Sequence, residues 1–120
     1  MLPTTDPLQP ERCAELLYAL AAPERLKIVR YLADGPHTVT EISESLDIPA
    51  VNLSHHLHVL KVSHLIQGKK RGRFVLYSLM DGVLKEVVAA GVPADALNLG
   101  CCQIVMPLEK VSAANQPNCE

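Results

Sequence analysis

Two short helices separated by a tight break are predicted from the stretch Thr38–Val62, TVTEISESLDIPAVNLSHHLHVLKV. Thr38 and Glu41 have the T-x-x-E spacing of a capping box, so the first helix begins there. Asp-Ile-Pro at 47–49 interrupts the pattern, and apolar residues then recur at helical spacing. The expected buried set of the second helix is Val51, Leu53, Leu57 and Leu60. Two helices joined by so short a turn are typical of a helix-turn-helix.

The flanking segments complete a winged helix-turn-helix. Apolar spacing predicts two helices over 11–32, before the motif. After the motif, 65–70 and 74–79 have the character of two strands joined by Arg-Gly-Arg at 71–73. Helical spacing then returns over 81–90. We therefore expect a mainly α fold with a small β-hairpin wing, in the order four helices, hairpin, helix.

The chain is expected to fold as one domain with less regular ends. At 120 residues it supports a single domain with a modest core, and chains this small often bury further apolar surface by dimerising. We divide the chain into a flexible arm at 1–10, the winged helix-turn-helix domain at 11–92, a cysteine-containing segment at 93–109 and a disordered tail at 110–120.

Basic residues are concentrated in the predicted recognition helix and wing. The window 48–80 holds five of the eleven Lys and Arg residues and none of the thirteen Asp and Glu residues. Four of the five histidines lie there too and add charge when protonated. Because phosphate binding depends on local charge, the overall net charge of −2 does not oppose it. The charge pattern therefore predicts a nucleic-acid-binding face.

Three motifs occur in order between residues 20 and 79, about half of the chain. They are AAPERLKI at 21–28, SHHL at 54–57 followed by Leu60-Lys61, and RGR at 71–73 followed by YSL at 77–79. The set resembles the second-helix, recognition-helix and wing motifs of the ArsR/SmtB family of small bacterial repressors. The resemblance implies a homodimeric winged-helix repressor that releases operator DNA when a metal, metalloid or oxidant reaches a thiol- or imidazole-bearing site.

The sequence also departs from that family. The family's C-x-C in the third helix is absent, because residues 41–46 contain no cysteine. Of its His/Asp zinc set after the wing, only Asp81 offers a candidate. His64 stands where the family usually has glycine, before the first wing strand. An inducer site must therefore lie elsewhere.

The candidate DNA-binding residues lie on the recognition helix and wing. N-terminal side chains of a recognition helix face base edges, where Asn suits adenine, Ser donates or accepts, and Ala meets a thymine methyl. The cations are expected to contact phosphate, although charged hairpin tips are also common on solvated surfaces. His56 is expected to be half-buried rather than a reader. The predicted set is Ala50, Asn52, Ser54, His55, Lys61, Lys69, Lys70, Arg71 and Arg73.

The adjacent thiols of Cys101 and Cys102 form the candidate sensory site. Thiolates favour soft ions, and the candidate inducers are As(III) or Sb(III), Cu(I), Cd(II) and Zn(II), with no obligatory cofactor. Gly100 eases the backbone bend that would bring the two sulfurs together. A pyramidal metalloid needs a third sulfur, either from Cys119 on the tail or from Cys13 across a dimer.

Other interpretations of the cysteines stay open. A thiol-redox or persulfide switch would use the same residues. It would pair Cys101 or Cys102 with Cys13 or Cys119, because a bond between adjacent cysteines closes a strained ring. The cysteines also suit simple packing, since Cys is a small hydrophobe that is often buried.

Other classes of protein have little support in the sequence. There is no Gly-rich phosphate loop, H-E-x-x-H pair or G-x-S-x-G elbow, so an enzyme is not expected. A winged helix without inducer that only binds proteins would favour a neutral or apolar wing. No apolar run approaches the roughly 20 residues of a membrane span, and no signal peptide is evident. We expect a cytoplasmic protein with reduced thiols that binds double-stranded operator DNA and no membrane.

Overall fold

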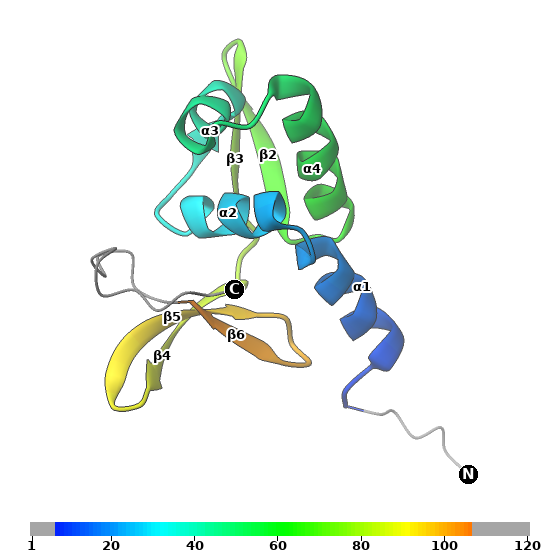
Figure 1. Cartoon of the computed structure of the whole chain (residues 1–120), viewed down its shortest axis with the longest axis vertical. Coiled ribbons are helices and arrows are strands. Elements are labelled where there is room, and N and C mark those ends of the chain that lie inside the picture. Colours follow the sequence, from blue (N-terminus) through cyan, green and yellow to red (C-terminus); the bar gives the residue numbers. More distant parts are fainter. Residues whose placement is uncertain (1–6, 107–120) are drawn as a thin grey trace.

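The computed structural model describes residues 7–106 and contains the four helices predicted before the wing (Figure 1). Proline occupies the first turn of both early helices, where its missing N–H is not needed. None of the helices in this part of the chain is long and apolar enough to cross a membrane. The helices are α1 (Pro10–Leu20), α2 (Pro23–Leu32), α3 (Val39–Leu46) and α4 (Ala50–Val62).

Local side-chain chemistry fixes the helix-turn-helix. The hydroxyl oxygen of Thr38 accepts a hydrogen bond from the Glu41 N–H at 3.2 Å, and the Glu41 carboxylate accepts one from the Thr38 N–H at 2.9 Å. This is the predicted capping box, and it begins α3. Asp47 ends α3 in the left-handed conformation at φ 55°. The chain then enters α4 directly, so the predicted tight break is confirmed.

The wing is a three-stranded antiparallel sheet in the order β1-β3-β2. Its strands are β1 (His37–Thr38), β2 (Ile66–Arg71) and β3 (Phe74–Leu79), with Arg71 opposite Phe74 at the tip. Gly72 turns the tip at φ 63°, in the region that favours glycine. His64, before β2, has φ 63° as well, the same left-handed conformation on a residue with a side chain.

The prediction of a helix over 81–90 is wrong. The chain forms a second antiparallel sheet there, with β4 (Leu84–Ala89), β5 (Val92–Asn98) and β6 (Gln103–Met106) in that order. Ala90 and Gly91 both have positive φ and form a two-residue hairpin turn, where we expected the end of a helix. The β4–β5 hairpin crosses residue 93, where we divided the chain, and the predicted tail at 110–120 lies outside the described residues.

The second sheet packs on the helical core. Val83, Leu97 and Leu99 are buried in the same apolar cluster as the core leucines and isoleucines of the four helices. Figure 1 shows α3 and the wing tip at one end of the molecule and the β4–β6 sheet towards the other, with α2 between them. The sheet therefore lies away from the predicted DNA-binding face and beside α1.

Candidate functional site

The recognition helix α4 exposes most of its predicted readers. Ala50, Asn52, Ser54 and His55 are all exposed, while Leu53, Leu57 and Leu60 are buried. Helical geometry of about 100° per residue spreads the readers around the exposed arc, with Asn52 roughly 160° from Ser54. The structure therefore places them on one exposed half of the helix rather than along a single narrow stripe.

Val51 departs from the sequence prediction. We expected it in the buried set of α4, but its side chain is 83% exposed at the N-terminal end of the helix. The signal was present in the sequence, because Val51 lies on the opposite side of the helix from Leu53 and Leu60. An exposed valine at this place has the chemistry to contact a thymine methyl group.

The wing exposes its cations. Lys61 and the four basic side chains of the β2–β3 hairpin are exposed, and within residues 7–106 none of the five forms an ion pair. Successive strand residues point to opposite faces, so Lys69 and Arg71 share one face of β2 and Lys70 lies on the other. The hairpin tip is thus positively charged on both faces, as a phosphate-binding surface requires.

His56, a half-buried residue of α4, contacts a buried arginine of α2. Arg25 of α2 is only 7% exposed, and its guanidinium lies 3.2 Å from Nδ1 of His56. Because arginine only donates, Nδ1 is the acceptor and the ring proton of neutral His56 lies on Nε2, which is 4.0 Å from the Glu24 carboxylate. Burial, reinforced by the Arg25 charge, lowers the pKa of His56. His56 is therefore a half-buried structural residue, as predicted.

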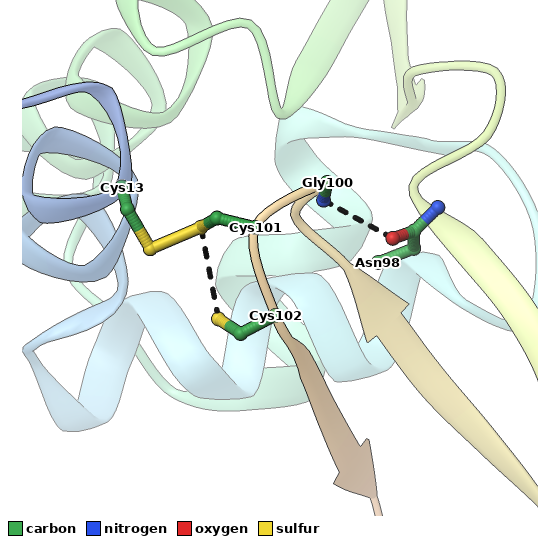
Figure 2. Close-up of a disulfide and its surroundings, with 5 residues drawn as sticks. All are labelled: Cys13, Asn98, Gly100, Cys101 and Cys102. Atoms are coloured by element: carbon green, nitrogen blue, oxygen red, sulfur yellow. Dashed lines mark hydrogen bonds between the residues drawn. A yellow bond between two sulfur atoms is a disulfide. The ribbon is translucent and has the colours of Figure 1, made fainter. Parts of the chain in front are cut away.

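Three cysteines from two distant segments meet at the other site. Figure 2 shows Cys13 of α1 facing the turn between β5 and β6, which carries Cys101 and Cys102. Cys13 and Cys101 form a disulfide with a Cα–Cα distance of 6.0 Å. The Cys102 sulfur lies 3.9 Å from that of Cys101, and all three sulfurs are within 4.8 Å of one another. The site is therefore a compact group of three soft donors.

The turn between β5 and β6 positions the adjacent pair. Gly100 adopts φ 87°, and its N–H donates to the side-chain oxygen of Asn98 at 3.1 Å. The Leu99 N–H donates to the Cys102 carbonyl at 2.9 Å and closes the turn. Glycine thus makes the bend that we expected from the sequence.

The pairing departs from one expectation and matches another. We expected reduced thiols, whereas Cys13 and Cys101 are bonded. The redox alternative placed such a bond between Cys101 or Cys102 and either Cys13 or Cys119, and the observed bond is one of these pairs. Cys13, which we considered as a donor across a dimer, meets Cys101 within one chain because the β4–β6 sheet turns its β5–β6 loop back onto α1. No bond joins the adjacent pair, and Cys102 stays a free thiol. Cys119 lies outside the described residues.

A small cavity lies beside the disulfide. Its volume is about 140 Å³, and Arg12, Cys13, Gly100 and Cys101 are among the residues that line it. Cys13 is only 6% exposed, whereas Cys101 and Cys102 are partly exposed. The side of the site that carries Cys101 and Cys102 is therefore the more accessible one.

Arg12, which precedes Cys13 on α1, connects this site to the recognition helix. Its guanidinium donates to the Ser63 carbonyl at 3.0 Å, directly after the last residue of α4. A cation is favourable at this position because the C-terminal end of a helix carries partial negative charge. The sequence analysis missed this contact, since nothing local indicates a partner 51 residues away.

The chain is similar to known proteins over much of its length. Residues 22–67 match the family described as bacterial regulatory protein, arsR family. The HTH-type transcriptional repressor SmtB of Mycobacterium tuberculosis (strain H37Rv) is 39% identical over 93 residues, covering 73% of this chain and 69% of that protein. A probable mercury resistance operon repressor of Streptomyces lividans is 31% identical over 96 residues, covering 78% of this chain and 77% of that protein.

A solved structure supports the same fold. The homodimeric winged helix-turn-helix DNA-binding domain of Mb0332 from Mycobacterium bovis, described as a possible ArsR-family transcriptional regulator, superposes with a TM-score of 0.59. It is 26% identical, and the match covers 66% of this chain and 75% of that domain. The predicted fold class is therefore confirmed.

Proposed function

The chain belongs to the ArsR family of DNA-binding transcriptional repressors, and we propose that a thiophilic metal or metalloid ion on its three-cysteine cluster releases it from operator DNA. It is a regulator and not an enzyme. The observation that carries the proposal is the approach of three cysteine sulfurs to within 4.8 Å of one another. The mercury resistance repressor among its relatives supports an ion of this chemical class.

The donor set suits a soft ion. Cysteine thiolates prefer As(III), Sb(III), Cu(I), Cd(II) and Hg(II) over hard cations, and three sulfurs match the pyramidal coordination of a trivalent metalloid. Cys13, Cys101 and Cys102 would hold the ion in their reduced form, since only thiolates ligate. An ion held in this way would tie α1 to the β5–β6 turn.

The DNA-binding face is proposed to use both the helix and the wing. The N-terminal half of α4, with Val51 added to the four predicted readers, would face base edges in the major groove. Lys61 and the wing cations would contact phosphates. We propose a homodimer, supported by the homodimeric structural relative and by the exposed apolar side chains of Leu17 and Tyr18 on α1.

Communication between the two sites is proposed to run through α1. Two recognition helices of a dimer must lie about 34–36 Å apart to enter successive major grooves. An ion that repositions Cys13 also moves Arg12 and its contact with the end of α4. A coupling free energy of about 1–3 kcal/mol is sufficient for a regulatory response.

Exchanging Cys102 for serine is expected to abolish ion-induced release and leave operator binding intact. One of three soft donors is lost, whereas the DNA-binding face lies elsewhere. The measurement is fluorescence anisotropy of reduced protein on an inverted-repeat operator from its own upstream region, titrated with As(III), Hg(II), Cd(II), Cu(I) and Zn(II).

The matched control for this experiment is Cys119→Ser, which removes the fourth thiol and should release DNA like the wild type. If the wild type stays on DNA with every ion, the proposed function is wrong. If Cys102→Ser responds to As(III) like the wild type, the three-cysteine cluster is not the sensor.

Replacing Arg12 by glutamine is expected to weaken the response without removing the ion site. The variant loses the charged contact with the Ser63 carbonyl, so operator affinity with and without ion should differ several-fold less than in the wild type. Ion affinity is followed separately by thiolate absorbance. Arg30→Gln makes the same charge change on α2 and serves as the control. An unaltered response in Arg12→Gln would show that coupling takes another route.

A further inference from the structure

We propose that the Cys13–Cys101 disulfide is a redox gate on the ion site, so that only the reduced chain takes up the ion. This inference rests on the proposed function, because it concerns the regulation of the same three sulfurs. Two of the three donors are consumed when the disulfide forms, and a disulfide sulfur is not a thiolate ligand. Cys102 alone remains as a thiol, and one thiolate does not make a trigonal site.

The position of the disulfide favours a reversible bond. Disulfides are rare in cytosolic and nuclear proteins, and those that occur are usually transient and redox-sensing. This bond joins the partly exposed Cys101 to the buried Cys13, and the cavity of about 140 Å³ lies directly beside it. That volume accommodates a small oxidant such as hydrogen peroxide, since a water molecule occupies about 30 Å³ in the liquid.

The oxidation balances with a peroxide as oxidant. The Cys101 thiolate attacks one peroxide oxygen, the O–O bond breaks, and a sulfenic acid and hydroxide form. The Cys13 thiol then attacks the sulfenic sulfur, the S–S bond forms, and the sulfenic oxygen leaves as water. The Cys13 proton leaves in that water, and the hydroxide of the first step takes up the proton that Cys101 released on becoming a thiolate. Two thiols therefore lose two electrons, and the peroxide is reduced to two water molecules.

A dithiol reductant reverses the gate by exchange. Its thiolate attacks the exposed Cys101 sulfur, forms a mixed disulfide and frees Cys13 as a thiolate. The second thiol of the reductant then closes its own disulfide and frees Cys101.

The protein has two further cavities, and neither supports a new site. The apolar groove between α1 and α4, lined by Tyr18, Val59 and Val62, has nothing in the structure that shows what covers it. The cavity between α4 and β3, lined by Ser54, Lys61 and Tyr77, belongs to the DNA-binding face already described. The cysteine cluster differs from both because it places a disulfide and a free thiol within 4.8 Å of one another.

The test measures As(III) binding to the full chain in three preparations: reduced, oxidised with one equivalent of hydrogen peroxide, and oxidised then treated with dithiothreitol. The readout is thiolate–As(III) absorbance in the ultraviolet, and peptide mapping follows the Cys13–Cys101 bond. We expect one As(III) per reduced chain, affinity lower by on the order of 100-fold after oxidation, and full recovery after dithiothreitol. Cys119→Ser should behave like the wild type in all three preparations, which excludes a disulfide with the fourth cysteine.

The outcomes separate the gate from the proposed function. Equal As(III) affinity in the oxidised and reduced chains would overturn the gate and leave ion sensing intact. Absence of the Cys13–Cys101 bond after oxidation would also overturn the gate. Absence of As(III) binding to the reduced chain would overturn the proposed function and the gate with it. Cys102→Ser should still form the bond on oxidation while binding As(III) weakly when reduced, because Cys102 ligates but is not part of the disulfide.

Discussion

Replacing both Arg71 and Arg73 by alanine is expected to weaken operator binding about 100-fold or more at physiological salt. The two side chains are exposed at the wing tip, and no ion pair holds them within residues 7–106. A dimer would lose four phosphate contacts, and the log–log salt slope falls by about 0.9 for each. Fluorescence anisotropy between about 50 and 200 mM salt measures both the affinity and the slope.

The loss should be the same for the operator and for unrelated duplexes, because phosphate contacts carry no sequence information. Lys27→Ala with Lys85→Ala is the matched control, since these exposed lysines on α2 and β4 remove the same charge away from the wing. Equal losses in the two double variants would make the effect one of net charge and refute the wing as a DNA contact.

The helix-turn-helix and wing were predictable because their signals are local. The capping box of Thr38 and Glu41 needs only residues three apart, and the same holds for the break at 47–49. The wing needs only a glycine between two runs of strand-forming residues. Each of these signals can be recognised from residues that lie close together in the sequence.

The second sheet was not predictable in this way. Val83, Leu84, Val87 and Val88 have helical spacing, yet Leu84, Val87 and Val88 pair as part of a hairpin and Val83 lies directly before it. The deciding contribution is packing, since Leu97 of β5 and Leu99 of the following turn are buried on the helical core. Strand preference depends on such neighbours more than helix preference does. The Ala90–Gly91 turn was the one local sign, and it fits the end of a helix equally well.

The cysteine cluster was half predictable. Cys101 and Cys102 stand out as neighbours in the sequence, but Cys13 lies 88 residues before its partner. The sequence identifies the cysteines as soft donors but does not show which of them come together. That pairing depends on how the second sheet turns onto α1. The helix expected over 81–90 concealed this approach, since only the second sheet brings Cys101 back to α1 within one chain.

Arg25 makes contacts between helices that could not be predicted from the sequence. It belongs to the AAPERLKI motif, which we used only for resemblance, and the structure shows what it does. Its guanidinium donates to the Ala19 carbonyl at 2.7 Å and to the Tyr18 carbonyl at 3.4 Å, both in the last turn of α1. It also contacts His56 of α4. One buried side chain thus joins α1, α2 and α4.

Replacing Arg25 by methionine is expected to lower the free energy of unfolding by about 3 kcal/mol. Methionine keeps most of the aliphatic volume, so the loss reports the missing donors rather than a cavity. An unsatisfied buried carbonyl costs about 1–3 kcal/mol, and the lost cation at the end of α1 adds up to about 2 kcal/mol. Small domains have about 5–15 kcal/mol in total, so the loss is a large fraction. Urea unfolding at one fixed protein concentration measures it, because a dimer's stability depends on concentration.

Two companion variants make the origin of that loss testable. Arg30→Met changes an arginine on the same helix that makes no side-chain hydrogen bond or ion pair within residues 7–106, and it should stay within about 0.5 kcal/mol of the wild type. Arg25→Lys keeps the charge, but a single ammonium group cannot reach all three acceptors of the guanidinium. Its loss of stability should therefore fall between those of Arg25→Met and Arg30→Met. If lysine restores full stability, charge alone matters at this position. If methionine matches Arg30→Met, the three hydrogen bonds do not hold the helices together.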